Sequence, residues 1–281
     1  MSEGTDNALL ERFEQEIWSK VPHLEEGSET KVVNATPLVD MTVDFKECAK
    51  SVFKLDLDNA DLKVFGKMDS TLLTGSIKVR PAANIIHDAI VTGKLKSGQT
   101  VIEATSGNFG IALGLLSKLE LNVIALVSRK LQEGVFEELR NVNIRTMDLD
   151  MDICPAPGME GKQDLLVAKA SAANIRSQLS NLGFDTDIFD KASSEIESLL
   201  ASQDIINLAK FLAKIYGFFC PEQYDSQLNI DAHRTVTAAE IDQQLHEKGD
   251  SLEGYNIFCT FGTGGTSGGL SRYMSEKYGK K

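Results

Sequence analysis

Two glycine-rich loops constrain the fold of this chain more than any other feature of its sequence. Residues 105–110 read Thr-Ser-Gly-Asn-Phe-Gly and follow an apolar run at 101–104. Residues 262–266 read Gly-Thr-Gly-Gly-Thr and follow a run at 256–261. After each loop the apolar residues return at helical spacing. A strand that turns through glycines into a helix is the unit of a parallel α/β sheet, and the helix N-terminus so formed suits an anion.

Strands and helices are expected to alternate along most of the chain. The patterns predict strands at 63–68, 100–104, 122–127, 143–147 and 255–261, and helices at 8–20, 81–92, 107–118, 133–140, 230–247 and 267–278. This order favours a mainly parallel sheet covered by helices, because parallel neighbours need a crossover connection.

Residues 148–217 interrupt this alternation. The segment begins with three aspartates, reads Cys-Pro-Ala-Pro-Gly at 154–158, and then has helical apolar spacing over 165–179 and 194–216. We expect a helical insertion on the surface of a domain. The apolar residues through which it would pack are Leu165, Leu166, Ile196, Leu199, Leu200, Ile205 and Leu208.

The composition is that of a globular protein with an acidic surface. Of 281 residues, 42% are hydrophobic, and the formal net charge is -12 at pH 7. A nucleic-acid or anionic membrane partner requires a basic surface, so we expect neither. The four histidines and the cysteines at 48, 154, 220 and 259 show no metal-binding spacing. Unpaired cysteine spacing is typical of a reduced protein, which predicts a cytoplasmic location.

Lys78 is the candidate catalytic residue. Residues 75–78 read Gly-Ser-Ile-Lys, and a helix with Pro81 in its first turn follows. A loop lysine is usually a solvated surface residue. Beside Arg80 and a helix N-terminus, however, its pKa can fall enough to make the amine nucleophilic. With two anion-binding loops, this lysine indicates a pyridoxal phosphate enzyme, in which a lysine forms a Schiff base. An enzyme with another anionic cofactor would leave Lys78 unmodified.

Each loop has a structural and a functional interpretation. Residues 105–110 are either a capped turn from strand to helix or a site where amides and hydroxyls bind a substrate carboxylate. Residues 262–266 are either an ordinary glycine-rich loop or a phosphate-binding loop, and they match neither GxGxxG nor GxxxxGK[ST]. His233, which follows a candidate helix cap at Asp231, is expected to be a structural hydrogen-bonding residue.

Four motifs in the same order resemble the cysteine synthase and cystathionine β-synthase family of pyridoxal phosphate enzymes, the β-family of fold type II. They are Thr-Pro-Leu-Val at 36–39, Gly-Ser-Ile-Lys at 75–78 and the loops 105–110 and 262–266. The resemblance covers residues 35–281. It implies a two-domain α/β fold with parallel sheets covered by helices, like the tryptophan synthase β-subunit.

The resemblance also implies a domain organisation. An incomplete, larger cofactor-phosphate domain would comprise 1–71 plus 218–281. A smaller mobile domain would comprise 72–217 and would carry the helical insertion at 148–217. The family fold continues with more sheet after the phosphate loop, so the C-terminal part of that fold is expected to be absent from these 281 residues.

The resemblance further assigns a role to each motif residue. Lys78 would bind the cofactor pyridoxal 5′-phosphate and act as the catalytic base, and Asn108 would bond the cofactor's ring oxygen. The residues that would hold the phosphate are Gly262, Thr263, Gly264, Gly265 and Thr266. Those that would hold the substrate carboxylate are Thr105, Ser106, Gly107 and Gln223.

The implied activity is β-replacement on an O-activated serine, by a homodimeric transferase or lyase of amino-acid biosynthesis. The substrate would be a small amino acid, and the nucleophile sulfide or an amino-acid amine. Val79 stands where cysteine synthases usually have aspartate, and Phe109 where they usually have threonine. The lysine motif is therefore closest to the 2,3-diaminopropionate branch. The alternative is a non-catalytic or regulatory relative that keeps the cofactor pocket or a docking surface.

Overall fold

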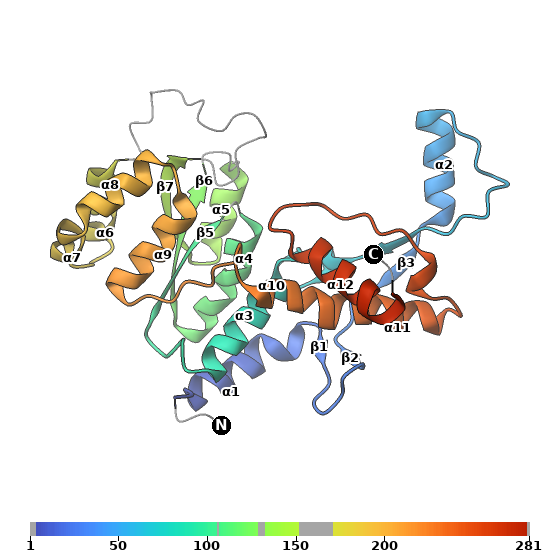
Figure 1. Cartoon of the computed structure of the whole chain (residues 1–281), viewed down its shortest axis with the longest axis horizontal. Coiled ribbons are helices and arrows are strands. Elements are labelled where there is room, and N and C mark those ends of the chain that lie inside the picture. The colour runs from blue at the N-terminus through green and yellow to red at the C-terminus, as the bar shows by residue number, and fades with distance from the viewer. Residues whose placement is uncertain (1–3, 106, 129–132, 152–170, 280–281) are drawn as a thin grey trace. The chain divides into compact units, whose positions relative to one another are not determined.

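The computed structural model describes residues 4–105, 107–128, 133–151 and 171–279, which form two compact units (Figure 1). The sheet unit comprises Met1–Ser19 and Lys78–Asn229, and the helical unit comprises Lys20–Ile77 and Ile230–Lys281. This division differs from the expected boundaries at 72 and 217. One reason is helix α1 (Asn7–Glu16), whose buried face packs on α3 (Val79–Val91) within the sheet unit.

A parallel sheet lies at the centre of the sheet unit, as the sequence predicted. Its strand order is β5 (Thr100–Thr105), β6 (Asn122–Ser128), β7 (Arg145–Met151), and both pairs are parallel. All six residues of β5 are buried, which is why its apolar residues Val101, Ile102 and Ala104 do not alternate with exposed polar ones.

Helices cover both faces of this sheet (Figure 1). On one side lie α3, α4 (Asn108–Leu113), the 3₁₀ helix η3 (Gly114–Leu119) and α5 (Glu133–Asn141). On the other lie α6 (Ala172–Asn181), α7 (Thr186–Lys191), α8 (Ser193–Ala201) and α9 (Ile205–Tyr216).

For residues 171–217, the expectation of a surface insertion is wrong, and residues 152–170 of the expected segment lie outside the described residues. Ile196, Leu200, Ile205 and Leu208 belong to one buried cluster with side chains of β5, β6 and β7. Alternate residues of each strand form an apolar face that has to be covered, and α6–α9 cover it. Leu199 packs at the edge of this cluster. Residues 165 and 166, also expected to pack here, lie outside the described residues.

The helical unit contains two small antiparallel pairs and several helices. The pairs are β1 (His23–Leu24) with β2 (Val32–Val33), and β3 (Leu38–Asp40) with β4 (Phe65–Lys67). The helices are α2 (Thr42–Phe53), η2 (Asp69–Thr71), α11 (Ala238–Glu247), η5 (Leu252–Gly254) and α12 (Gly265–Tyr278). The chain passes between the units three times. The first passage is in η1 (Trp18–Lys20), the second is at Ile77–Lys78, and the third is in α10 (Gln227–Asp231), which the π-helical η4 (Ala232–Thr237) continues into α11.

The strand expected at 255–261 is absent from the structure. Residues 255–261 have no helical or strand assignment, and Phe258 is 95% exposed. A strand needs a neighbour to bond its backbone groups. Within the described residues, each antiparallel sheet of the helical unit has two strands, and neither sheet includes residues 255–261.

A buried polar network accounts for Thr36 of the Thr-Pro motif. The Lys67 ammonium donates to Glu240 Oε1 at 2.6 Å, to Gln244 Oε1 at 2.8 Å and to the Thr36 carbonyl at 2.6 Å. The amide of Thr36 donates to Glu240, and its hydroxyl donates to Asp69 Oδ1 at 2.8 Å. Three segments far apart in the sequence are joined by these bonds.

We expect Leu208→Ala to lower the free energy of unfolding by about 2–4 kcal/mol, because removing a fully buried leucine leaves a cavity. Leu199→Ala on the neighbouring helix is the matched control and should cost clearly less, because Leu199 is only half-buried. Urea unfolding followed by circular dichroism measures both. Equal losses would contradict the place of α9 in the core.

Candidate active site

Lys78 lies at the start of α3. It is the N-terminal cap residue of this helix, and its carbonyl accepts from the amide of Ala82 at 3.2 Å. The preceding turn passes through Gly75 at φ +66°, a left-handed conformation that suits glycine. Burial lowers the pKa of the Lys78 amine below its ordinary value. A larger fraction of the Lys78 amine is therefore in the neutral, nucleophilic form at a given pH.

The loop after β5 depends on Thr105 and Gly107. Gly107 has φ +133° and ψ -85°, a conformation that residues with a Cβ rarely adopt. The buried Thr105 hydroxyl accepts from the amides of Gly107 at 3.2 Å and Gly110 at 3.1 Å. Thr105 therefore holds the loop together from inside. Asn108 is the first residue of α4 and is exposed, while Ser106 lies outside the described residues.

Gln223 reaches the same end of β5 from a distant part of the chain. Phe219 pairs with β5 by two backbone bonds, to Thr100 and to Ile102, both 2.9 Å. Four residues later the buried Gln223 side chain donates from Nε2 to the Ala104 carbonyl at 2.9 Å. Sequence reasoning proposed Gln223 for the substrate, and the structure adds that part of its side chain already binds the strand.

Glu103 is a buried carboxyl group that sequence reasoning missed. Its side chain is almost inaccessible and accepts from the amides of Gln223 at 3.1 Å and Ala104 at 2.9 Å. Burial raises the pKa of Glu103 to about 8, although these two amides act in the opposite direction. Burial also raises the pKa of the nearby Cys220 thiol. The signal in the sequence was a single glutamate inside the apolar run 101–104.

The candidate phosphate loop lies in the helical unit. Gly264 at φ +78° leads into α12, and no side chain caps the N-terminus of this helix. The Gly265 amide is 3.5 Å from Thr263 Oγ1, and Thr266 Oγ1 is 3.4 Å from Nε2 of the buried His233. Backbone amides, two hydroxyls and a helix N-terminus are the donors that a phosphate group needs. The loop therefore fits the phosphate of the implied cofactor.

Beneath this loop, α12 approaches residues 230 and 233 so closely at Gly269 that a larger side chain would not fit. A Cβ on Gly269 would lie 2.5 Å from His233 Cβ and 2.7 Å from the Ile230 carbonyl. His233 itself lies within hydrogen-bond distance of Thr237, with 3.0 Å between Nδ1 and Oγ1. The expected structural role of His233 agrees with these contacts, and its place beside Thr266 was not predicted.

The predicted site residues belong to two groups. The structure brings Thr105, Gly107, Asn108 and Gln223 together around the end of β5 in the sheet unit, to which Lys78 also belongs. The loop 262–266 belongs to the helical unit. No cluster of potential metal ligands occurs in the described part of the chain, and none of its helices is long and apolar enough to span a membrane.

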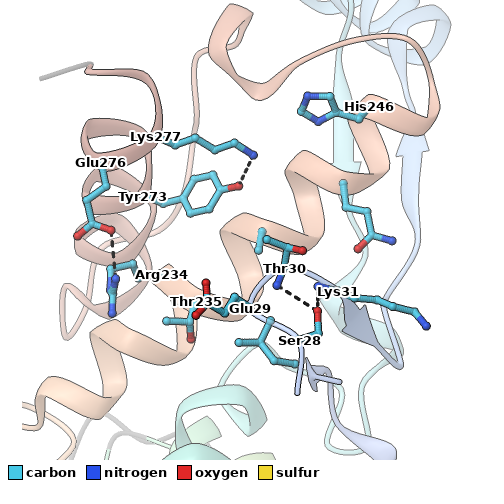
Figure 2. A pocket seen from close by; sticks show the side chains of 13 residues that line it. Ser28, Glu29, Thr30, Lys31, Arg234, Thr235, His246, Tyr273, Glu276 and Lys277 are labelled. Carbon is cyan, nitrogen blue, oxygen red and sulfur yellow. Dashed lines mark hydrogen bonds and ion pairs between the residues drawn. The ribbon is translucent and has the colours of Figure 1, made fainter. Parts of the chain in front are cut away.

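The helical unit also contains a cavity of about 840 Å³, and none of the predicted site residues lines it (Figure 2). It is bordered by residues 28–31, by η4 and α11, and by α12. Several of its charged side chains have partners in the protein: Arg234 is 3.1 Å from Glu276, and Lys277 is 2.5 Å from the buried Asp242. We assign this cavity no part in the reaction.

Comparison with known proteins identifies the class. Residues 51–281 match the family described as pyridoxal-phosphate dependent enzyme, and the chain belongs to this family. Its cofactor is pyridoxal 5′-phosphate.

Among individual proteins, the chain is 24% identical over 250 residues to a cysteine synthase of Staphylococcus aureus, covering 89% of this chain and 60% of the relative. It is 27% identical over 222 residues to the cystathionine beta-synthase of Saccharomyces cerevisiae, covering 78% and 35%. The chain thus spans about 60% or less of the length of these relatives.

Solved structures share the fold. An O-acetylserine dependent cystathionine beta-synthase from Helicobacter pylori superposes with a TM-score of 0.53 at 21% identity, covering 90% of this chain and 63% of the other. An O-ureido-L-serine synthase gives 0.52 at 24% identity, with 78% and 53% covered. The expected fold type II architecture is confirmed.

The raised pKa of Glu103 predicts a pH-dependent stability. Between about pH 4.5 and pH 8 the folded chain keeps a proton on Glu103 that the unfolded chain has lost. Stability should therefore fall as pH rises through this window, by at most about 1.4 kcal/mol per pH unit.

Glu103→Gln should remove this component of the slope, because an amide does not titrate. Urea unfolding at several pH values measures it, and Glu137→Gln, on the exposed face of α5, is the control. A slope that is the same in wild type and Glu103→Gln would show that the Glu103 carboxyl is ionised in the folded protein.

Proposed function

We propose that this chain carries out β-replacement on an O-activated serine, with sulfide or an amino-acid amine as the nucleophile. The observation that carries the proposal is Lys78, a half-buried lysine with a lowered pKa at the start of α3, in a chain of the pyridoxal-phosphate dependent family. Support also comes from relatives whose names include cysteine synthase, O-acetylserine and O-ureido-L-serine.

The chemistry divides between the cofactor and the protein. When bound, pyridoxal phosphate supplies the electron sink for reactions at the amino-acid α-carbon. In this proposal, the Lys78 amine holds the cofactor and then moves the proton of the substrate's α-carbon. A lysine whose pKa is lowered by burial suits both roles, because each needs the neutral amine.

In this proposal, the remaining residues bind and orient the cofactor and the substrate. The amides at the start of α12 and the hydroxyls of Thr263 and Thr266 would hold the phosphate. Asn108 would bond the ring oxygen. The loop at 105–107, together with Gln223, would hold the substrate carboxylate, since the amides at this turn form an anion site whose shape Thr105 maintains.

Pyridoxal phosphate added to the purified chain should give a yellow protein, and borohydride reduction should fix the cofactor covalently on Lys78. Peptide mapping by mass spectrometry locates the adduct. Lys78→Ala should lose it, while Lys94→Ala, which changes an exposed lysine of the same unit, should keep it. An adduct mapped to another lysine would refute the assignment, and a colourless protein would favour the non-catalytic alternative.

Asn108→Ala and Thr105→Ala should separate binding from folding. Asn108 is exposed, so its replacement should weaken spectral changes on adding an amino acid while leaving stability within about 0.5 kcal/mol. Thr105→Ala should in addition cost about 1–2 kcal/mol, because two loop amides lose their acceptor. Titration with O-acetylserine and urea unfolding measure the two effects. If Asn108→Ala binds the amino acid as wild type does, Asn108 has no part in the site.

A further inference from the structure

The backbone pairing on one edge of β5 stops at a proline. On the edge opposite β6, Phe219 is the parallel partner of Val101 and pairs with the strand by two backbone bonds of 2.9 Å. In the same register the next partners would be Glu103 and Pro221. Proline has no N–H to donate, so the ladder of backbone bonds cannot continue through Pro221.

Two side chains take over the bonding at the next residue of the strand, Ala104. The Ala104 amide donates to Glu103 Oε1 at 2.9 Å, and the Ala104 carbonyl accepts from Gln223 Nε2 at 2.9 Å. The second oxygen of Glu103, Oε2, accepts from the backbone amide of Gln223 at 3.1 Å. Glu103 therefore joins the end of β5 to the segment that returns to it, and Gln223 is held through both its backbone and its side chain.

Burial makes this arrangement of Gln223 specific. Glu103 is 1% exposed, Gln223 3% and Asn229 2%. Asn229 Nδ2 donates to the Gln223 carbonyl at 2.8 Å, so this residue is also held from its other side. A buried amide that loses its acceptor cannot turn to water instead. An apolar side chain at position 103 would suit a buried strand, but it would leave the amides of Ala104 and Gln223 without these acceptors.

Glu103 and Thr105 hold the two segments that meet at the end of β5. They are two residues apart, so their side chains leave the strand on the same face. Thr105 holds the outgoing loop through the amides of Gly107 and Gly110, and Glu103 holds the incoming Gln223. Ligands of parallel sheets bind at the carboxyl ends of the strands, which is where these two segments meet.

We propose that Glu103 is a positioning residue for the carboxylate of the amino-acid substrate and that it acts through Gln223. The Gln223 side-chain nitrogen has two N–H groups, and the bond to Ala104 uses one of them. With the backbone of Gln223 fixed by Glu103, the second N–H stays at the end of β5 to donate to the carboxylate. This inference rests on the proposed function, and it adds a cause for selecting amines that carry a carboxylate.

Two ligands that differ by the carboxylate test the inference. L-Serine and 2-aminoethanol are titrated into the chain loaded with pyridoxal phosphate, and the spectral change gives an apparent Kd for each. Wild type should prefer L-serine. Glu103→Leu nearly keeps the size of the side chain but removes both acceptor oxygens, and it should reduce this preference at least about tenfold, as expected when a hydrogen bond to a charged group is lost.

Two further variants separate positioning from stability. Glu103→Gln keeps one oxygen as an acceptor, while its amide nitrogen cannot accept, so its preference should lie between those of wild type and Glu103→Leu. Leu208→Ala changes a buried residue of α9 that bonds neither Glu103 nor Gln223, and it should keep the wild-type preference although it is less stable. Circular dichroism shows whether each variant is folded.

Hydrogen exchange followed by NMR gives a readout that needs no cofactor. The backbone amides of Ala104 and Gln223 should be protected in wild type, because each is buried and bonded to Glu103. In Glu103→Leu both should exchange at least about tenfold faster, while the amides of β6 keep their protection. If Glu103→Leu does not fold, the wild-type exchange and the preference of Glu103→Gln decide.

The outcomes that would overturn the inference are distinct from a failure of the proposed function. The role of Glu103 is refuted if the Ala104 or Gln223 amide exchanges freely in wild type, or if a Glu103 variant keeps the full preference for L-serine. It is also refuted if Leu208→Ala loses the preference equally, or if Glu103→Gln is no better than Glu103→Leu. A wild type that binds L-serine no better than 2-aminoethanol would refute the carboxylate site itself.

Discussion

The pairing of β5 on both of its edges is the interaction on which the sheet unit depends. One edge joins β6 in parallel register, and the other accepts Phe219, which follows α9. Every residue of β5 is buried, and the strand ends at Thr105. The turn at Gly107 is held by the hydroxyl of Thr105, and the pairing of Phe219 brings Gln223 to the same end of the strand. The substrate side of the candidate site is thus a consequence of how one strand is enclosed.

In the helical unit a buried ion pair has a comparable role. Lys67 and Glu240 lie largely out of water, and taking two charges out of water is costly unless their remaining hydrogen-bonding groups have partners. Gln244 and the carbonyl of Thr36 provide these partners for the ammonium, and the amide of Thr36 provides one for the carboxylate. Such a set specifies one arrangement of its segments, since any displacement leaves a buried charge without its bonds.

The helices and strands that could be predicted are those whose secondary structure depends mainly on their own residues. β5 and β6 were predicted to within a residue or so because strands buried on both faces are rich in apolar residues on both sides. The segment 255–261 has a similar pattern but is no strand, because strand pairing depends on a neighbour. Apolar spacing in 194–216 correctly predicted helices, but it indicates that a face is buried and not what buries it. The bonds from Glu103 and Phe219 link positions more than a hundred residues apart, and no local pattern indicates them.

The helix N-termini of the described chain differ in whether a side chain caps them, and the helices that begin at Lys78 and at the glycine-rich loop are among the uncapped ones. Asp6, Ser171, Asp185 and Asp204 cap α1, α6, α7 and α9, each accepting a bond from an amide of the first turn. No side chain of the N-cap residue bonds the first turn of α3 or α12, which begin at Lys78 and the glycine-rich loop, and the same is true of α2, α4, α8 and α11. A side-chain cap typically contributes about 1 kcal/mol, so these helices forgo stability. An aspartate at Gly264 would occupy the first amides of α12 and repel an anion, whereas glycine leaves both the donors and the helix dipole directed at the loop. The same physics that makes a cap stabilising makes its absence useful where a phosphate has to bind.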